Sequence, residues 1–381
     1  MKNILLLLLF CVLISCKNEK SSNTYSYNLK ASEIIKSFVL DSDVKYNAFY
    51  LYTFSDDKGK EYLTFLNYRT NQILFYDLET TDFLFKLNLN SEGPHGVVQP
   101  TGLYVKDLNH IYVSSYVYSG LMRVDTTCHI IQKIPYGITS KGYNVLPSYT
   151  PSSHPYIAPV IIDKKIYITQ NAIDRFHPIV DTPLSVVIDT VQKSCEDLPL
   201  TYGILTEKEL AIKDPRFSRV FNGKEFIYSF YVSEDIVVTS VDHSEVKKIS
   251  VKSKYLDSPI VKQEVSERGP QLNLELARYG DLIYDPYREV YYRFVYPKTT
   301  LEDNIRWWGK SVYGRKKFSV IILNKDFQII GETLFPESIY NSYVFFKSYV
   351  FSCHLSSIGN LSQSFIAICI VFLLYLFIFL F

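Results

Sequence analysis

Residues 102–135, GLYVKDLNHIYVSSYVYSGLMRVDTTCHIIQKIP, contain four short apolar segments that are separated by tight polar turns. Val, Ile and Tyr favour strands, and the turns carry Asp, Asn, Ser and Gly. The last two segments form a hairpin around Asp125, whose carboxylate can accept a hydrogen bond from the backbone two residues further on. This stretch therefore predicts one unit of four antiparallel strands.

The same hairpin recurs along the chain. Four further segments end a strand in Asp or Asn, turn, and begin a second strand; they are residues 71–89 around Asp77, 184–198 around Asp189, 235–251 around Asp242 and 318–334 around Asn324. Two more strands precede each hairpin, for example GDLIYD and EVYYRFV before Asn324. Four-stranded units repeated about every 45 residues or more are typical of a β-propeller, although a sandwich with irregular loops is an alternative.

The predicted fold is all-β, a six-bladed β-propeller over residues 41–351 with an incomplete sixth blade. YVFFKSYVF at 343–351 would be the inner strand of that blade, and the segment from Tyr25 to Val39 would supply its outer strand. Its two middle strands are missing, because an apolar tail stands in their place. In the fifth blade, Tyr291, Tyr292 and Arg293 lie on an alternating strand and are expected to pack between blades.

The amino end predicts export. Residues 1–15 combine Lys2 with an apolar run, which is typical of a secretory signal. Leu13-Ile14-Ser15-Cys16 resembles the lipobox of bacterial lipoproteins, and the resemblance implies that Cys16 becomes the lipidated amino terminus. Residues 16–40 would then form a spacer and the closing strand. Because Lys17 and Asn18 follow Cys16, the same resemblance favours the outer membrane over the inner one.

The carboxyl end, residues 352–381, is atypical. Its last seventeen residues, 365–381, are apolar and uncharged, at the lower limit for a transmembrane helix. Two interpretations stay open at this point: a second membrane anchor, or the product of a shifted reading frame.

A family resemblance rests on the blade junctions. EGPHGVVQPTGLYV at 92–105, followed by IYV at 111–113, is similar to the junctions of six-bladed propellers related to the NHL and TolB repeats. Together with the lipobox and DPYREVYYRFVYP at 285–297, the chain resembles the propeller lipoproteins of Bacteroidetes, a family with no assigned function. The resemblance covers residues 40–347 and implies a fold but no chemistry.

Charge and motifs restrict the function. Forty basic and thirty-nine acidic residues give a nearly neutral chain, which does not indicate a nucleic-acid partner. The sequence contains no G-x-S-x-G, P-loop, H-E-x-x-H or C-x-x-C motif, so it predicts no catalytic residue, metal-ligand set or cofactor. An oxidising compartment would allow a disulfide between Cys128 and Cys195, but the cysteine spacing indicates no framework.

Long loops are expected on one face of the propeller, which we call the long-loop face, and short turns on the opposite, short-turn face. Insertions on one face of a repeat protein usually mark a binding surface. The loop at 301–317 holds Arg306, Trp307 and Trp308, which could stack on a sugar or peptide or merely pack the loop. The same face holds three histidines, His95, His154 and His177, which could form a metal or acid-base site. No two of them have the spacing of metal ligands, and a histidine in a loop more often bonds to a backbone carbonyl.

Two functions are compatible with these features of the sequence. The first is a lipid-anchored binding or scaffold protein of the cell envelope that recognises a protein or glycan through the long-loop face. The alternative is a metal-dependent propeller hydrolase, lactonase-like or glycan-cleaving, which would need acidic side chains converging from several inner strands. A structural envelope protein with two membrane anchors is a third, weaker interpretation.

Overall fold

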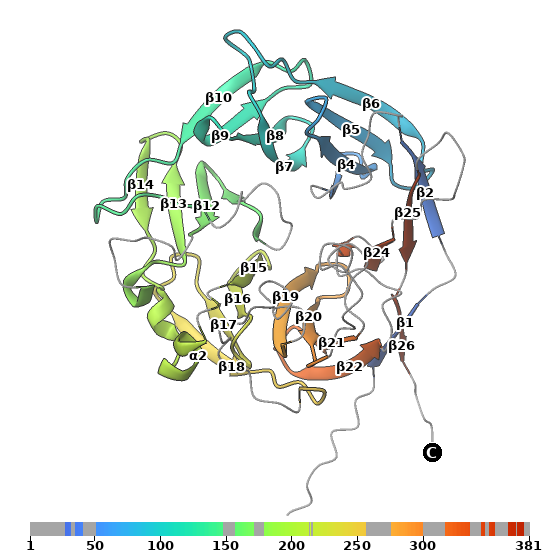
Figure 1. The fold of residues 1–381 in the computed structure, drawn as a ribbon, viewed down its shortest axis with the longest axis vertical. Coiled ribbons are helices and arrows are strands. Elements are labelled where there is room, and N and C mark those ends of the chain that lie inside the picture. Colours follow the sequence, from blue (N-terminus) through green and yellow to red (C-terminus); the bar gives the residue numbers. More distant parts are fainter. Residues whose placement is uncertain are drawn as a thin grey trace, which may run out of the picture.

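The computed structural model describes a ring of small antiparallel sheets (Figure 1). The described residues are 27–31, 35–40, 51–147, 157–170, 179–212, 214, 216–256, 276–299, 317–335, 344–346, 350–354, 365–370 and 372–376. In each sheet built from consecutive strands, the first strand lies towards the centre of the ring and the fourth lies at its rim. This arrangement is a β-propeller.

The described residues form five blades of consecutive strands. Blade 1 contains β3 (Leu51–Ser55), β4 (Glu61–Asn67), β5 (Gln72–Asp77) and β6 (Phe83–Asn88). Blade 2 contains β7 (Pro100–Asp107), β8 (His110–Ser115), β9 (Tyr118–Val124) and β10 (Ile130–Pro135). Blade 3 contains β11 (Val160–Ile162), β12 (Lys165–Thr169), β13 (Ser185–Asp189) and β14 (Ser194–Asp197).

Blades 4 and 5 complete this series. Blade 4 contains β15 (Phe217–Phe221), β16 (Phe226–Phe230), β17 (Asp235–Thr239) and β18 (Val246–Ser250). Blade 5 contains β19 (Arg278–Asp285), β20 (Val290–Tyr296), β21 (Phe318–Leu323) and β22 (Ile329–Phe335). Short helices η2 (Ile179–Asp181), η3 (Tyr202–Ile204) and α2 (Glu207–Ala211) lie in the connections within and after blade 3.

The sequence predicted six blades, but the structure contains five blades that are built from consecutive strands. The remaining sheet draws on both ends of the chain, in the order β2 (Ile35–Val39), β25 (Phe365–Ile370), β24 (Val350–His354) and β23 (Val344–Phe346). The predicted strand near Val39 is thus present at one edge of this sheet. Part of the apolar tail, β25, pairs directly with it, although the sequence predicted that the tail lies outside the propeller.

The ends of the chain also extend blade 5. β1 (Tyr27–Ala31) lies beside β22, and β26 (Phe372–Leu376) pairs with β1. The backbone N–H of Leu29 donates to Thr333 Oγ1 over 2.7 Å. A Cβ atom added to Gly331 would lie 2.2 Å from the carbonyl oxygen of Tyr27, so glycine is required for this close approach.

Two other expectations concern the tail and the cysteines. None of the helices in the described ranges has the length and hydropathy that a membrane span requires. Cys128 and Cys195 are both free thiols. The disulfide that an oxidising compartment would allow is therefore absent between them.

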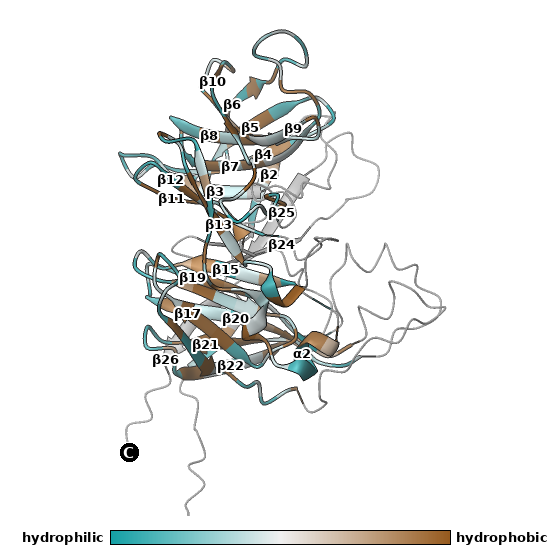
Figure 2. Cartoon of the chain, turned by 90° about the vertical axis from the view of Figure 1, so that its left-hand side faces the viewer, coloured by the Kyte–Doolittle hydropathy of each residue, from teal (hydrophilic) through white to brown (hydrophobic). Residues whose placement is uncertain are grey.

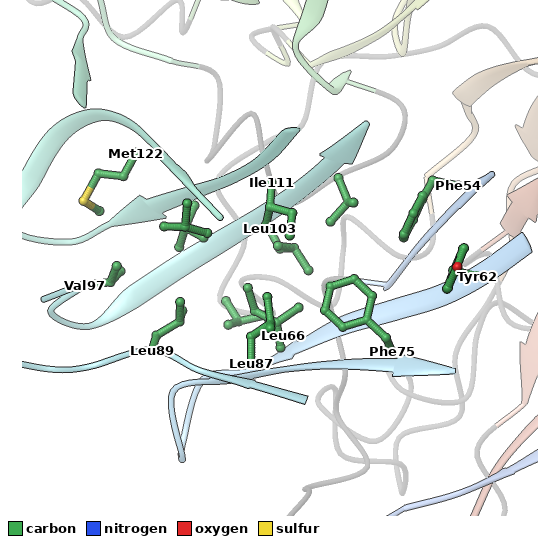
Figure 3. Packing of buried hydrophobic residues seen from close by; sticks show 14 residues of the cluster. Phe54, Tyr62, Leu66, Phe75, Leu87, Leu89, Val97, Leu103, Ile111 and Met122 are labelled. Carbon is green, nitrogen blue, oxygen red and sulfur yellow. The ribbon is translucent and has the colours of Figure 1, made fainter. Parts of the chain in front are cut away.

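The hydrophobic core lies between neighbouring blades. Figure 3 shows the cluster between blades 1 and 2, in which Phe54 and Phe75 of one blade meet Leu103 and Ile111 of the next. Leu103 and Ile111 are completely buried, and the rings of Phe54 and Phe75 pack edge to face with centroids 6.2 Å apart. In the side view, most of the brown, hydrophobic colour lies on the strands, which also carry white and teal segments, and many of the turns are teal (Figure 2).

The predicted hairpin turns are confirmed at all five positions. The side-chain oxygens of Asp77, Asp125, Asp189, Asp242 and Asn324 each accept a hydrogen bond from the backbone N–H two residues further on, over 2.8 to 3.1 Å. Because these turns join the third and fourth strands of blades 1 to 5, they all lie on the short-turn face. An Asx turn therefore joins the third and fourth strands in each of these five blades.

Replacing Asn324 with Ala should lower the free energy of unfolding by about 1 to 2 kcal/mol, because Asn324 Oδ1 accepts two backbone hydrogen bonds. Its donors are the N–H groups of Asp326 and Gln328, at 3.0 and 2.9 Å. Urea denaturation measures the change. Asn324→Asp retains the acceptor and is the matched control, with an expected change within about 0.5 kcal/mol. Equal losses in both variants would contradict the role given to the turn.

Candidate functional site

A cavity of about 690 Å³ lies at the centre of the propeller. It is lined by residues of the five inner strands β3, β7, β11, β15 and β19 and by the turns that follow β15 and β19. Phe221 and Tyr284 line it from the carboxyl ends of β15 and β19, whereas Tyr52 comes from the beginning of β3, and Ala158 and Pro159 precede β11. The cavity therefore extends along the channel to its short-turn end, whereas the sequence predicted a binding surface on the long-loop face.

Phenol side chains form part of the cavity wall. Tyr52 of β3 and Tyr104 of β7 both line it, with ring centroids 6.0 Å apart and planes nearly perpendicular. Tyr52 is 5% exposed, and its hydroxyl makes no hydrogen bond within the structure. Burial raises the pKa of Tyr52, and the neighbouring Tyr104 raises it further, so the phenol stays neutral and can donate a hydrogen bond.

Two cations contribute to the same wall. Lys106, near the end of β7, is exposed, whereas Arg219 of β15 is only 2% exposed. The Nη atoms of Arg219 donate to Ser185 Oγ at 2.8 Å and to the carbonyl oxygens of Ala158 and Tyr167 at 3.0 Å. Its Nε–H is buried and makes no hydrogen bond. Burial lowers the pKa of Arg219, but a guanidinium remains charged near neutral pH.

A chain of buried hydrogen bonds leads from Arg219 into the short-turn face. Ser185 Oγ lies 2.7 Å from the hydroxyl of Tyr228, and this hydroxyl lies 2.5 Å from His243 Nε2. His243 Nδ1 lies 3.2 Å from the carbonyl oxygen of Val241, which can only accept, so Nδ1 carries the proton. Nε2 then accepts from Tyr228, Tyr228 accepts from Ser185, and Ser185 accepts from Arg219.

The direction of this chain keeps His243 neutral. A second proton on the imidazole would turn Nε2 into a donor to the Tyr228 hydroxyl, so Tyr228 and Arg219 would both donate to Ser185 Oγ and the hydroxyl of Ser185 would lose its acceptor. Burial first, and then the charge of Arg219, lower the pKa of His243 to about 4. Arg219 is thus a rigidly held positive charge at the cavity, without a carboxylate among the hydrogen-bond partners described.

The cavity is suited to an anion with an apolar body. Its described lining contains Lys106 and Arg219 but no Asp, Glu or His. No group of three or more potential metal ligands of the His, Cys, Asp or Glu type occurs among the described residues. The acidic side chains that the hydrolase alternative needs do not converge on this cavity.

Most of the predicted site residues lie outside the described ranges, namely Cys16, His154, His177, Arg306, Trp307 and Trp308. His95 is described and is exposed in the connection between blades 1 and 2. Its ring contacts that of His129, with centroids 4.9 Å apart, and it does not line the cavity. The structure therefore does not bring His95 into the described site.

Four residues of the cavity wall, Tyr52, Tyr104, Lys106 and Arg219, were not predicted from the sequence. Each is one residue of an ordinary inner strand, and the four come from three blades. They do not share a position in the repeat, because Tyr52 is near the beginning of β3, Arg219 is in the middle of β15 and Lys106 is near the end of β7. The repeat therefore contained no common signal for these residues.

Comparisons with known proteins agree with the fold. Residues 26–334 match the model of DUF4221, a domain of unknown function. The crystal structure of a DUF4221 member from Bacteroides vulgatus is 25% identical, with a TM-score of 0.75, over 92% of this chain and 99% of that one. A Bacteroides fragilis protein described as exported is 10% identical, with a TM-score of 0.51, over 88% and 86%. Among curated proteins, none matches the sequence.

Proposed function

Because the chain belongs to the DUF4221 family, a family of unknown function, we propose from its geometry that it is a binding protein of the bacterial cell envelope. Its ligand is the acidic end of a glycan, held in the central cavity. The observation that supports this most strongly is the composition of the cavity wall, in which phenols and two cations occur without a carboxylate.

The chemistry of the wall fits an acidic sugar. Aromatic rings such as those of Tyr52 and Tyr104, which line the cavity, can pack against the apolar faces of sugar rings. The exposed ammonium group of Lys106 can pair with a carboxylate, and the buried charge of Arg219 adds to the positive potential of the same wall. A volume of about 690 Å³ is within the range of small-ligand sites and fits one or two sugar units.

The envelope location is part of the proposal. Lipid attachment at Cys16 would tether the propeller to a membrane, the outer membrane in preference to the inner one. The neighbouring Bacteroides fragilis structure is of a protein described as exported, which agrees with this location. Recognition of a protein partner through the loop of Trp307 and Trp308 stays a prediction, because that loop lies outside the described residues.

Binding should depend on the ligand's charge and on Lys106. In isothermal titration, a disaccharide that ends in glucuronate should bind the full chain, and its neutral glucose-ended analogue should bind at least tenfold more weakly. Lys106→Gln should lower the affinity for the charged ligand about tenfold, since one charge-assisted hydrogen bond is worth about 1.4 kcal/mol or more.

The control for this experiment is Lys141→Gln, because Lys141 is exposed in a loop that does not line the cavity. This variant should bind as the parent protein does. Equal affinity for the charged and neutral disaccharides, or an unchanged affinity of Lys106→Gln, would contradict the proposed function.

A further inference from the structure

The wall of the central cavity has a polar side and an apolar side. Blades 1 and 2 contribute Tyr52, Thr53, Tyr104 and Lys106. Blades 3 to 5 contribute two consecutive apolar or aromatic residues from each inner strand, and we call these six residues the apolar side; they are Val160 and Ile161 of β11, Val220 and Phe221 of β15, and Ile283 and Tyr284 of β19.

The two sides lie opposite each other. In Figure 1, β7 is across the centre of the ring from β15 and β19. Lys106, near the end of β7, is therefore separated by the cavity from the apolar residues that end β15 and β19. A ligand that reaches across the cavity would meet a cation at one end and apolar side chains at the other.

The apolar side is partly accessible, unlike the core between the blades. Each of its six residues is half-buried and lines the cavity, whereas the neighbouring core residues Phe226 and Ile227 are completely buried. Apolar surface that remains in contact with water inside a cavity is a favourable place for an apolar part of a ligand, because binding removes that surface from water.

The polar side chains of this half of the wall are largely engaged within the protein. Besides Tyr284, blades 3 to 5 add Arg219 and Asn222 to the described lining. Asn222 Nδ2 donates to the hydroxyl of Tyr291 at 2.8 Å, and its Oδ1 accepts from the N–H groups of Lys224 and Glu225 at 2.9 and 2.8 Å. The guanidinium of Arg219 is buried against its own acceptors. These two residues therefore leave the surface beside them mainly apolar.

The two aromatic rings of the apolar side are held by other rings. Phe221 packs against Phe226, with centroids 4.8 Å apart, and Tyr284 packs against Tyr291, with centroids 4.9 Å apart. Tyr291 in turn packs against Phe327 at 5.0 Å. Because these rings are fixed before a ligand arrives, little conformational entropy is lost when it binds.

We propose that the apolar side is a subsite for an apolar substituent of the ligand, such as an alkyl group attached to the acidic sugar. This subsite extends the proposed glycan site, on which it depends: the sugar lies against Tyr52 and Tyr104, and the substituent lies across the cavity from Lys106. A volume of about 690 Å³ has room for both parts. The ligand is then amphipathic, with a charged sugar and a short apolar chain.

Isothermal titration of the full chain with methyl and butyl β-glucuronide tests the proposal. Each methylene group that leaves water tightens binding up to about fourfold, so the butyl compound should bind at least about tenfold more tightly than the methyl compound. Ile283→Thr makes one side chain of the subsite shorter and polar. It should weaken binding of the butyl compound about fivefold and change binding of the methyl compound less than about twofold.

A second variant and a matched control accompany Ile283→Thr. Val220→Thr keeps the shape of the side chain and should act in the same direction, which covers the case that Ile283→Thr does not fold. The control is Ile131→Thr, because Ile131 is 48% exposed on β10 and does not line the cavity. It should bind both compounds as the parent protein does.

Two further measurements separate the subsite from recognition of the charge. Lys106→Gln should weaken binding of both glucuronides and leave the preference for the butyl compound unchanged. Methyl and butyl β-glucoside, which carry no charge, should show the same preference when their weaker binding is followed by NMR. Equal binding of the methyl and butyl members of both series, or a preference that persists in both Ile283→Thr and Val220→Thr, would overturn the proposal.

Discussion

Replacing Arg293 with Met should lower the free energy of unfolding by about 4 kcal/mol. Arg293 lies on β20 of blade 5 and is completely buried. Its guanidinium donates to backbone carbonyl oxygens of blade 4 and the chain that follows it, including those of Ser233 and Glu234 at 2.6 Å and Val251 at 3.0 Å. No carboxylate is among its described partners.

Two further contacts hold this side chain. Arg293 Nε donates to Ser229 Oγ at 3.0 Å, and the guanidinium lies 3.9 Å from the centroid of the Tyr279 ring. Burial lowers the pKa of Arg293 to about 10, so it remains a cation at neutral pH. The bonds compensate for the desolvation of the charge, and their loss would leave several buried carbonyl groups without a donor.

Guanidinium chloride denaturation would measure this loss, with Arg69→Met as the matched control because Arg69 is exposed. The control should change the free energy of unfolding by less than about 0.5 kcal/mol. A loss below about 1 kcal/mol for Arg293→Met would show that the carbonyl groups find other donors, and that Arg293 does not join the two blades.

The second large effect concerns pH. Between pH 7 and pH 4.5 the stability of the parent protein should change little, because two buried groups respond to pH in opposite directions. In a variant that lacks one of these groups, the free energy of unfolding should change with pH as the remaining group dictates. The groups are His243 in blade 4 and Asp281 in blade 5.

For His243, the pKa falls from 6.5 in the unfolded chain to about 4 in the folded protein. The unfolded chain therefore binds more protons between these values, and stability falls as the pH decreases through this window. The expected loss between pH 7 and pH 4.5 is about 2 kcal/mol. Nδ1 already donates to the carbonyl of Val241, and Nε2 accepts from the hydroxyl of Tyr228, so a second proton would disrupt the chain of hydrogen bonds that leads to Ser185.

For Asp281, the pKa rises from 3.8 to about 6, so the folded protein binds more protons in this window. Stability then increases as the pH decreases, again by about 2 kcal/mol between pH 7 and pH 4.5. Asp281→Asn should therefore lose stability towards pH 4.5, and His243→Asn should gain it. Asn suits position 243 because His243 has a positive φ of 60°.

Urea denaturation at pH 7 and pH 4.5 provides the test. The aspartates of the hairpin turns have lowered pKa values, as for Asp242 at about 2, and contribute little above pH 4.5. The test compares how the free energy of unfolding of each variant changes between the two pH values, and not the stability of the variants at one pH. Equal slopes for the parent and both variants would contradict the assignment.

The repeated hairpins could be predicted from sequence because their cause is local. At Asp77 and Asn324 the side chain bonds a backbone N–H two residues away, so a short pattern contains the whole turn. The alternation of Tyr291, Tyr292 and Arg293 likewise indicated packing between blades. It did not indicate that Arg293 would bind the carbonyl groups of the preceding blade, since those partners lie 42 residues or more away.

The sheet that joins β2 with β25 and the lining of the central cavity could not be predicted, because both depend on contacts between residues far apart in the sequence. Ile35 pairs with Cys369, and no local pattern connects the two segments. Tyr52, Lys106 and Arg219 meet at the cavity only after three blades have formed around it. The unusual composition of the long loops led instead to a predicted site in those loops. The loop that contains Trp307 lies outside the described residues.

The most direct test of the proposed function is a crystal structure of the full chain grown with the glucuronate-ended disaccharide. We expect the sugar in the central cavity, packed against Tyr52 and Tyr104, with its carboxylate paired with Lys106. A disaccharide bound elsewhere on the propeller, or an empty cavity at saturating ligand, would contradict the account.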